Sequence, residues 1–135
     1  MAFVATLTTE AEVTANPTWG DVEREICALD GAVHTLVVLA PPSPLGPPSG
    51  DHHLAIGGGL DGGLIVFVTE DNLTFWNLRN PENRGATRVV RMSIGGQEGD
   101  YRAAQIVSRD LALRAARRYV EDGQRAGDLE WTIGT

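Results

Sequence analysis

The sequence predicts an α+β fold, a largely antiparallel sheet of about six to seven strands with two helices packed on one face. Short β-prone segments follow one another through the middle of the 135-residue chain, and only brief turn signals separate them. The two segments with helical periodicity lie outside that run. Connections this short join strands as antiparallel hairpins, because a parallel crossover needs a dozen or more residues.

The chain begins with a predicted strand and a predicted helix. Residues 2–8 alternate weakly and are β-prone, which indicates a strand. Thr18 is a suitable N-cap, and Asp21 places an acidic side chain in the first helical turn. Gly31 supplies the C-terminal stop. The apolar face of this helix consists of Val22, Ile26 and Leu29.

Predicted strands make up the centre of the chain. The first covers residues 33–40, and a Pro-rich segment, residues 41–50, follows it. Because strands continue on both sides, we interpret this segment as a loop insertion in a single domain of residues 1–135. Turn signals separate the later strands, which predicts a meander. These strands cover residues 52–58, 64–69, 73–78 and 87–93.

The second helix follows a predicted loop. Residues 94–107 are Gly-rich and polar, which is typical of a loop. Ser108 then provides an N-cap and Gly123 a C-cap, and residues 129–133 form a last strand. The apolar face of the helix consists of Ala112, Ala115, Ala116, Tyr119 and Val120.

Composition and charge limit the classes of partner. Acidic residues outnumber basic ones 18 to 11, giving a net charge of −7, and every basic residue is Arg. Such a surface repels nucleic acid and anionic lipid, which bind through cationic contacts to phosphate, and it attracts a cationic protein. The alternative is that the charge only keeps the protein soluble.

The sequence also indicates where the protein acts. Its N-terminus, MAFVATLTTE, has no basic region and no long apolar run. No stretch has the roughly 18 apolar residues of a membrane span. The single Cys27 cannot form an internal disulfide. We therefore expect a cytoplasmic protein that does not bind membranes.

Two patterns that suggest ligand chemistry have simpler interpretations. His52 and His53 are adjacent, so on a strand they point to opposite faces, and no further His or Cys lies at ligand spacing. The glycines of residues 57–63 lead into a strand, whereas a phosphate loop opens a helix. We predict a hairpin turn there, and neither a metal nor a cofactor.

Cys27 and His34 are the residues that an enzyme would use. Cys27 lies on the first helix, at the edge of its buried side, and His34 lies on the next strand, which allows the two to meet. No Ser lies in a nucleophile elbow, and no carboxylate pair has a catalytic spacing. The prediction is a protein that is not an enzyme, with a small enzyme using Cys27 and His34 as an alternative.

Three of the aromatic residues on predicted strands are considered for the core or for an interface. Phe75 and Trp76 are neighbours, so they must point to opposite faces of the sheet. One of them should be core, and the other should be exposed or covered by a helix. An exposed aromatic on a sheet is a candidate interface anchor. Trp131, in the last strand, is expected in the core.

The C-terminal third carries a recognisable pattern. Residues 107–123 and 129–131 combine an Ala-containing helix, an aromatic near its end, a Gly and a strand closing on Trp. This pattern resembles the first immunity-protein family of bacterial polymorphic toxin systems, and the likeness extends over nearly the whole chain. Family members often have Phe in place of Tyr119 and a Pro before the last strand. The matching residues are Ala112, Ala115, Tyr119, Gly123 and Trp131.

The resemblance implies inhibition by binding. Such a protein neutralises a cognate toxin domain, often a nuclease or a nucleic-acid deaminase, through a tight complex inside the producing cell. A toxin that binds nucleic acid is often basic, and an acidic inhibitor attracts such a protein electrostatically. We expect the free protein to be a monomer, without cofactors. The matching residues belong to the fold, so they identify no contact site.

Candidate toxin contacts are therefore sought among acidic and aromatic residues in or beside the predicted turns and the Gly-rich loop. They are Asp51, Asp61, Glu70, Asp71, Trp76, Glu98 and Asp100. For each of them the alternative is an ordinary solvated residue.

Two further classes of function stay open at this point. An adaptor or chaperone for a secreted effector would bind a delivery domain and leave toxin activity intact. A homo-oligomeric structural module would self-associate without a partner.

Overall fold

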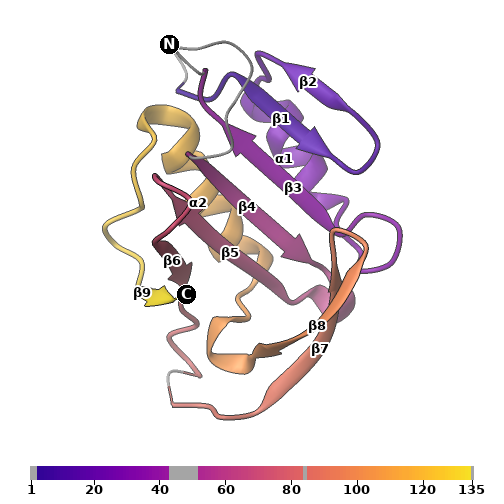
Figure 1. Cartoon of the computed structure of the whole chain (residues 1–135), viewed down its shortest axis with the longest axis vertical. Helices are drawn as coiled ribbons and strands as arrows, with labels where there is room; N and C mark the ends of the chain where they lie inside the picture. Colours follow the sequence, from indigo (N-terminus) through magenta and orange to yellow (C-terminus); the bar gives the residue numbers. More distant parts are fainter. Residues whose placement is uncertain (1–2, 43–51, 84, 135) are drawn as a thin grey trace.

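The computed structural model describes residues 3–42, 52–83 and 85–134, and it confirms the α+β class (Figure 1). Seven strands form one antiparallel sheet in the order β2-β1-β3-β4-β5-β6-β9, and two form a separate hairpin. The sheet consists of β1 (Thr6–Thr9), β2 (Val13–Ala15), β3 (Leu36–Ala40), β4 (His53–Gly58), β5 (Leu64–Thr69), β6 (Phe75–Leu78) and β9 (Trp131–Gly134). The hairpin consists of β7 (Val89–Ile94) and β8 (Gln97–Arg102), and the helices are α1 (Trp19–Cys27) and α2 (Arg109–Asp122).

Both helices pack on the same face of the sheet and enclose the core with it (Figure 1). Thr18 caps α1 through a reciprocal capping box, in which its hydroxyl accepts from the Asp21 amide and the Asp21 carboxylate accepts from the Thr18 amide. Ser108 caps α2, and Gly123 ends it at a φ of 76°. Within the described ranges, neither helix is long and apolar enough to cross a membrane.

The predicted meander is confirmed for β4 to β6, which pair in sequence order, and β3 pairs with β4 beside them. The prediction is wrong after β6. β7 leaves the sheet, β9 pairs with β6 in its place, and residues 97–102, predicted as loop, form strand β8. Gly95 and Gly96 both have positive φ, as a type I′ hairpin turn requires. The sequence of β8, QEGDYR, has few residues that favour strands, which hides it from sequence analysis.

Some element ends also differ from the prediction. The first strand begins at Thr6, and the short strand β2 lies in a stretch predicted as polar loop. α1 ends at Cys27, before Gly31, and the Asp30 carboxylate accepts the amides of the turn that follows. The Pro-rich insertion lies, from residue 43 onward, outside the described residues.

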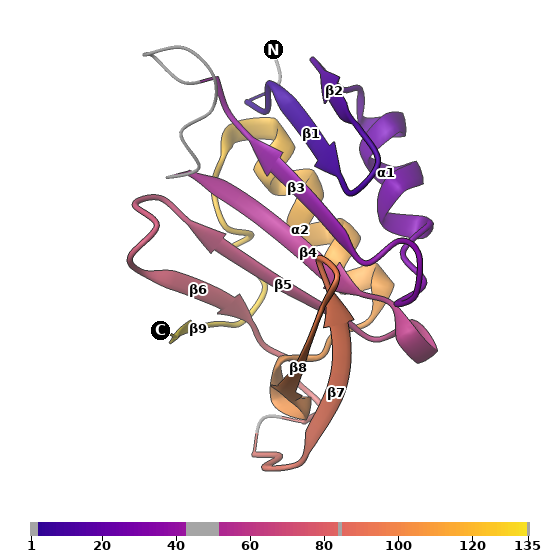
Figure 2. The same cartoon turned by 45° about the vertical axis from the view of Figure 1, so that its right-hand side comes forward.

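The hairpin crosses the sheet on the face that carries no helix. Figure 2 shows β7 and β8 in front of one end of β4 and β5, with the helices on the far side of the sheet. The sheet therefore has a helix-bearing face and an open face, and the hairpin covers one end of the open face.

Candidate functional site

The open face is built from alternate residues of β4, β5 and β6. In β5, Leu64 is fully buried in the core, whereas Ile65 and Phe67 point to the open face and are half-buried. The His53 and Phe67 ring centroids are 5.8 Å apart, and those of Phe67 and Phe75 are 5.5 Å apart. The open face thus presents a row of aromatic rings at edge-to-face angles.

The hairpin packs closely over two glycines of β4. A Cβ added to Gly57 would lie 2.5 Å from Ile94 Cγ2. A Cβ added to Gly58 would likewise collide with the side chain of Met92, which is 3% exposed. Because glycine has no side chain, β7 can lie close to β4 at this point. Any larger residue at these two positions would push β7 away.

A part-buried hydrogen-bond chain holds the tip of the hairpin. The hydroxyl of Thr35, a residue 1% exposed, donates to Glu10 Oε2 at 2.6 Å and accepts from the Gly95 amide at 2.9 Å. The Glu10 carboxylate also accepts the amides of Thr35 and Leu36. Partial burial raises the pKa of the Glu10 carboxyl, but these hydrogen bonds outweigh it and leave the pKa below its ordinary 4.5. At neutral pH the charged carboxylate anchors the hairpin through Thr35.

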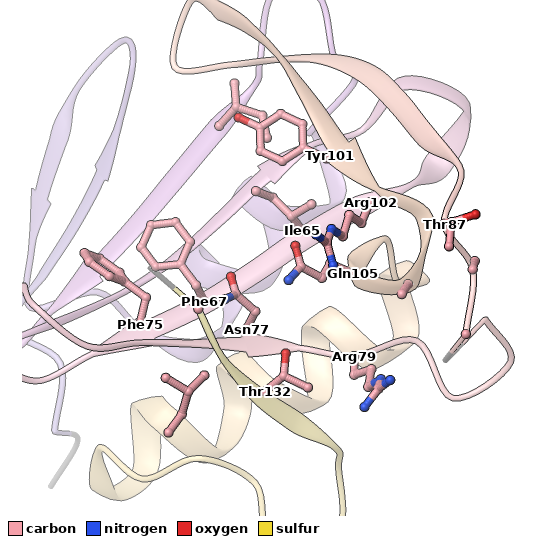
Figure 3. Close-up of a pocket in the computed structure, with 16 residues that line it drawn as sticks. Ile65, Phe67, Phe75, Asn77, Arg79, Thr87, Tyr101, Arg102, Gln105 and Thr132 are labelled. Atoms are coloured by element: carbon pink, nitrogen blue, oxygen red, sulfur yellow. The ribbon is translucent and has the colours of Figure 1, made fainter.

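A groove of about 830 Å³ lies between the hairpin and the open face (Figure 3). Ile65, Phe67 and Phe75 form its apolar floor, and Tyr101 of β8 lies across from them. The polar residues of its lining are Asn77, Arg79, Thr87, Arg102, Gln105 and Thr132. Aromatic floor and polar rim together make a composition typical of protein-binding surfaces.

Arg102 brings an unneutralised positive charge to the groove. It is exposed, and its side chain makes no hydrogen bond or ion pair with the part of the chain that the structure describes. Five other arginines form ion pairs with carboxylates, namely Arg24, Arg91, Arg114, Arg117 and Arg118.

The predicted toxin contacts do not gather on one surface. Asp61 and Glu70 flank β5 at its opposite ends, separated by roughly 20 Å of strand. Glu98 and Asp100 lie on β8 and not in a loop, and both pair with Arg91, at 3.1 and 3.5 Å. Neither of these two carboxylates is part of the groove lining.

The remaining predicted contacts fall into two groups. Asp71 and Trp76 have structural partners: the Asp71 carboxylate accepts the amides of Thr74 and Leu73, which keep its pKa below the ordinary 3.8 and close the β5–β6 turn. Trp76 points to the helix-bearing face, opposite Phe75 as predicted, and the Arg125 guanidinium lies 3.7 Å above its ring. Asp51 lies outside the described residues.

The residues considered for enzyme or metal chemistry are dispersed. Cys27 is exposed, not at the edge of the buried side as predicted, and His34 is exposed as well. His52 and His53 point to opposite sides, as predicted. The His52 ring is hydrogen-bonded to the buried Tyr119 hydroxyl, whereas the His53 ring packs on Phe67. In the described ranges, no three His, Cys, Asp or Glu residues are grouped so that they could hold a metal ion.

Burial and charge shift the pKa of the Tyr119 hydroxyl. Burial raises this pKa above its ordinary 10.0, and the charge of Glu70 raises it further. Tyr119 therefore stays protonated and acts as a hydrogen-bonding core residue. Glu70 lies near enough to influence it, and is thus beside a structural group of the fold.

One wall of the groove was not predicted from the sequence. Tyr101, Arg102 and Gln105 lie in the segment predicted as a loop. One signal was present: residues 64–68 are apolar at every position, a pattern typical of a strand buried on both faces. That pattern predicts a cover over the second face, although it does not say what the cover is.

Most of the chain matches a known protein family. Residues 10–133 match the family model of the immunity protein Imm1. No curated protein matches the chain significantly. Of the residues that carried the C-terminal resemblance, Ala112, Ala115 and Tyr119 are at most 1% exposed, so they stabilise the fold and contact no partner directly.

Proposed function

The chain belongs to the Imm1 family of immunity proteins, and we propose that the toxin it neutralises is a basic protein that acts on nucleic acid, a nuclease or a deaminase. Neutralisation by an immunity protein is inhibition by binding, and the family is not enzymatic. Cys27 and His34 therefore have no catalytic part. The protein is proposed to act as a monomer in the cytoplasm of the cell that makes the toxin.

The net charge of −7 is the observation that carries the proposed toxin chemistry. The acidic residues are concentrated at the N-terminal side, where residues 10–30 contain six carboxylates and a single arginine. Most of these carboxylates are exposed. A surface of this kind steers a cationic protein towards it and repels the nucleic acid that such a toxin binds.

The test is capture followed by co-expression. A tagged copy exposed to a lysate of its native cell should retain a stoichiometric, basic partner, identified by mass spectrometry. That partner should kill a host when expressed alone, degrade or deaminate nucleic acid in vitro, and be harmless when this protein is present. A partner that keeps its toxic activity in the complex would make this protein an adaptor and contradict the proposal.

Salt dependence tests the charge of the partner separately. The association rate constant should fall steeply as ionic strength rises, because screening shortens the range of attraction between the two proteins. A rate constant that does not change with salt would show that the toxin is not steered by charge. Sedimentation of the free protein as a single species of 14.5 kDa would support the monomer.

A further inference from the structure

The central strands are apolar on both faces, yet the chain covers only one of them with helices. Val37 and Leu39 of β3 face the core, and Leu36 and Val38 alternate with them on the open face. β5 repeats the pattern through Ile65 and Phe67. An antiparallel sheet with one wet face usually places polar residues on that face. The open face has instead the composition of a surface that becomes covered.

We propose that the groove between the β7–β8 hairpin and the open face is the surface that docks the toxin, and that it takes a bulky apolar side chain flanked by a carboxylate. This inference rests on the proposed function, since it names the surface and the partner chemistry for the same binding event. Figure 3 shows the floor, with Phe67 and Phe75, and the opposite wall, with Tyr101.

The apolar part of the occupant follows from the floor. Phe67 and Phe75 are in ring contact with each other and half-buried, so their positions are set before any partner arrives. Preorganised aromatic side chains give binding energy without the entropic cost of ordering. The hairpin anchored by Thr35 keeps Tyr101 on the far side of the groove. A bulky apolar side chain between these rings would lose its contact with water.

The carboxylate follows from Arg102. Its guanidinium makes no ion pair within the described part of the chain and lines the groove. A cationic side chain at this point would be repelled by the Arg102 guanidinium. A carboxylate of the toxin can form a charge-assisted, bidentate pair with Arg102. A toxin that is basic overall is compatible with this local contact, because steering depends on net charge and docking on the groups that touch.

A second copy of this chain is a poor occupant by the same reasoning. Each copy carries a net charge of −7, so two copies repel each other before their apolar groups can meet. The net charge thus favours a cationic partner of different sequence at this surface.

The decisive experiment compares residues of β8 that line the groove with residues of the same strand that do not. Tyr101→Ala and Arg102→Gln alter the groove. Asp100→Asn and Glu98→Gln, the outer-face variants, alter carboxylates that pair with Arg91 and are not part of the groove lining. Surface plasmon resonance against the captured toxin should show a Kd weakened about thirtyfold for Tyr101→Ala and about tenfold for Arg102→Gln. The two outer-face variants should stay within about threefold of the wild type. Arg102→Lys should recover part of the loss, because it keeps the charge and loses the bidentate geometry.

The outcomes separate this inference from the proposed function. If the wild type neutralises no toxin, the proposed function fails and the groove loses its partner. If the wild type neutralises the toxin and both groove variants bind as tightly as it does, the inference is overturned and the function stands. Loss of binding in the outer-face variants alone, or self-association of the free protein through the groove, overturns it equally.

Hydrogen exchange provides a readout that does not depend on how well a variant folds. In the complex of wild-type protein and toxin, the amides of residues 101–105 and of β6 should exchange at least tenfold more slowly than in the free protein. Amides of α1, on the helix-bearing face, are the internal control and should be unchanged. Protection of α1 without protection of the groove would place the toxin on the wrong face for this inference.

Discussion

The two faces of the central sheet have similar composition and different roles. On the helix-bearing face, Leu54, Ile56 and Leu64 are completely buried. On the open face, Ile65 and Phe67 stay half-buried above a groove. An apolar strand therefore does not by itself distinguish a stabilising face from a binding face. The difference depends on whether the chain supplies the cover or leaves it to a partner.

The largest expected effect on stability comes from truncating the side chains of two neighbouring residues of β5, one on each face of the sheet. Leu64→Ala should lower the free energy of unfolding by about 2–5 kcal/mol, because it leaves a cavity in the core. Ile65→Ala should lower it by only about 1 kcal/mol, because part of that side chain is already exposed, and it should weaken toxin binding. Urea unfolding measures both. Equal losses of stability would show that the open face belongs to the core.

The second prediction concerns the point where the hairpin meets the open face. Gly57→Ala should lower the free energy of unfolding by about 1–3 kcal/mol, because the new methyl group displaces Ile94. The displaced hairpin should also change the width of the groove and weaken toxin binding. Gly127→Ala is the matched control, since nothing lies within 4 Å of its added Cβ and its φ is not positive. If both variants melt alike, β7 does not depend on close packing over β4.

The third prediction is a pH dependence of the hairpin anchor. Because the folded-state pKa of Glu10 lies below its ordinary 4.5, its stabilisation is present above about pH 4.5 and is lost as pH falls through the lowered pKa. Glu10→Gln should therefore lower stability at pH 7 by about 1 kcal/mol, a figure that already allows for solvent screening. The difference from wild type should vanish in acid. A difference that persists at pH 3 would assign the effect to lost packing and not to charge.

The helix-bearing face could be predicted from the sequence because its signals are local. Thr18 and Ser108 are local N-cap signals and Gly123 a local C-cap signal. Only five residues separate β4 from β5, and five separate β5 from β6. The family resemblance also rested on this face, on Ala112 and Tyr119 of α2.

The groove could not be predicted, because non-local contacts create it. Tyr101 meets the open face only because Gly95 and Gly96 reverse the chain and Ile94 packs over Gly57. No spacing in the sequence reports that approach. The acidic contact candidates were chosen by charge and expected exposure, and Glu98 and Asp100 lie on β8, where they pair with Arg91 and do not line the groove.

The smallest expected effect concerns Trp76, the predicted contact that lies on the helix-bearing face. Arg125→Ala removes the cation above its ring and should lower the free energy of unfolding by about 0.5 kcal/mol, as exposed cation–π pairs do. Toxin affinity should not change, because the groove lies on the opposite face of β6. Urea unfolding and surface plasmon resonance measure the two quantities on one preparation. Arg117→Ala, which uncovers the Trp19 ring in the same way on α1, is the matched control. If Arg125→Ala weakens toxin binding tenfold and Arg117→Ala does not, Trp76 is part of the interface, and the toxin reaches round the β9 edge to the helix-bearing face.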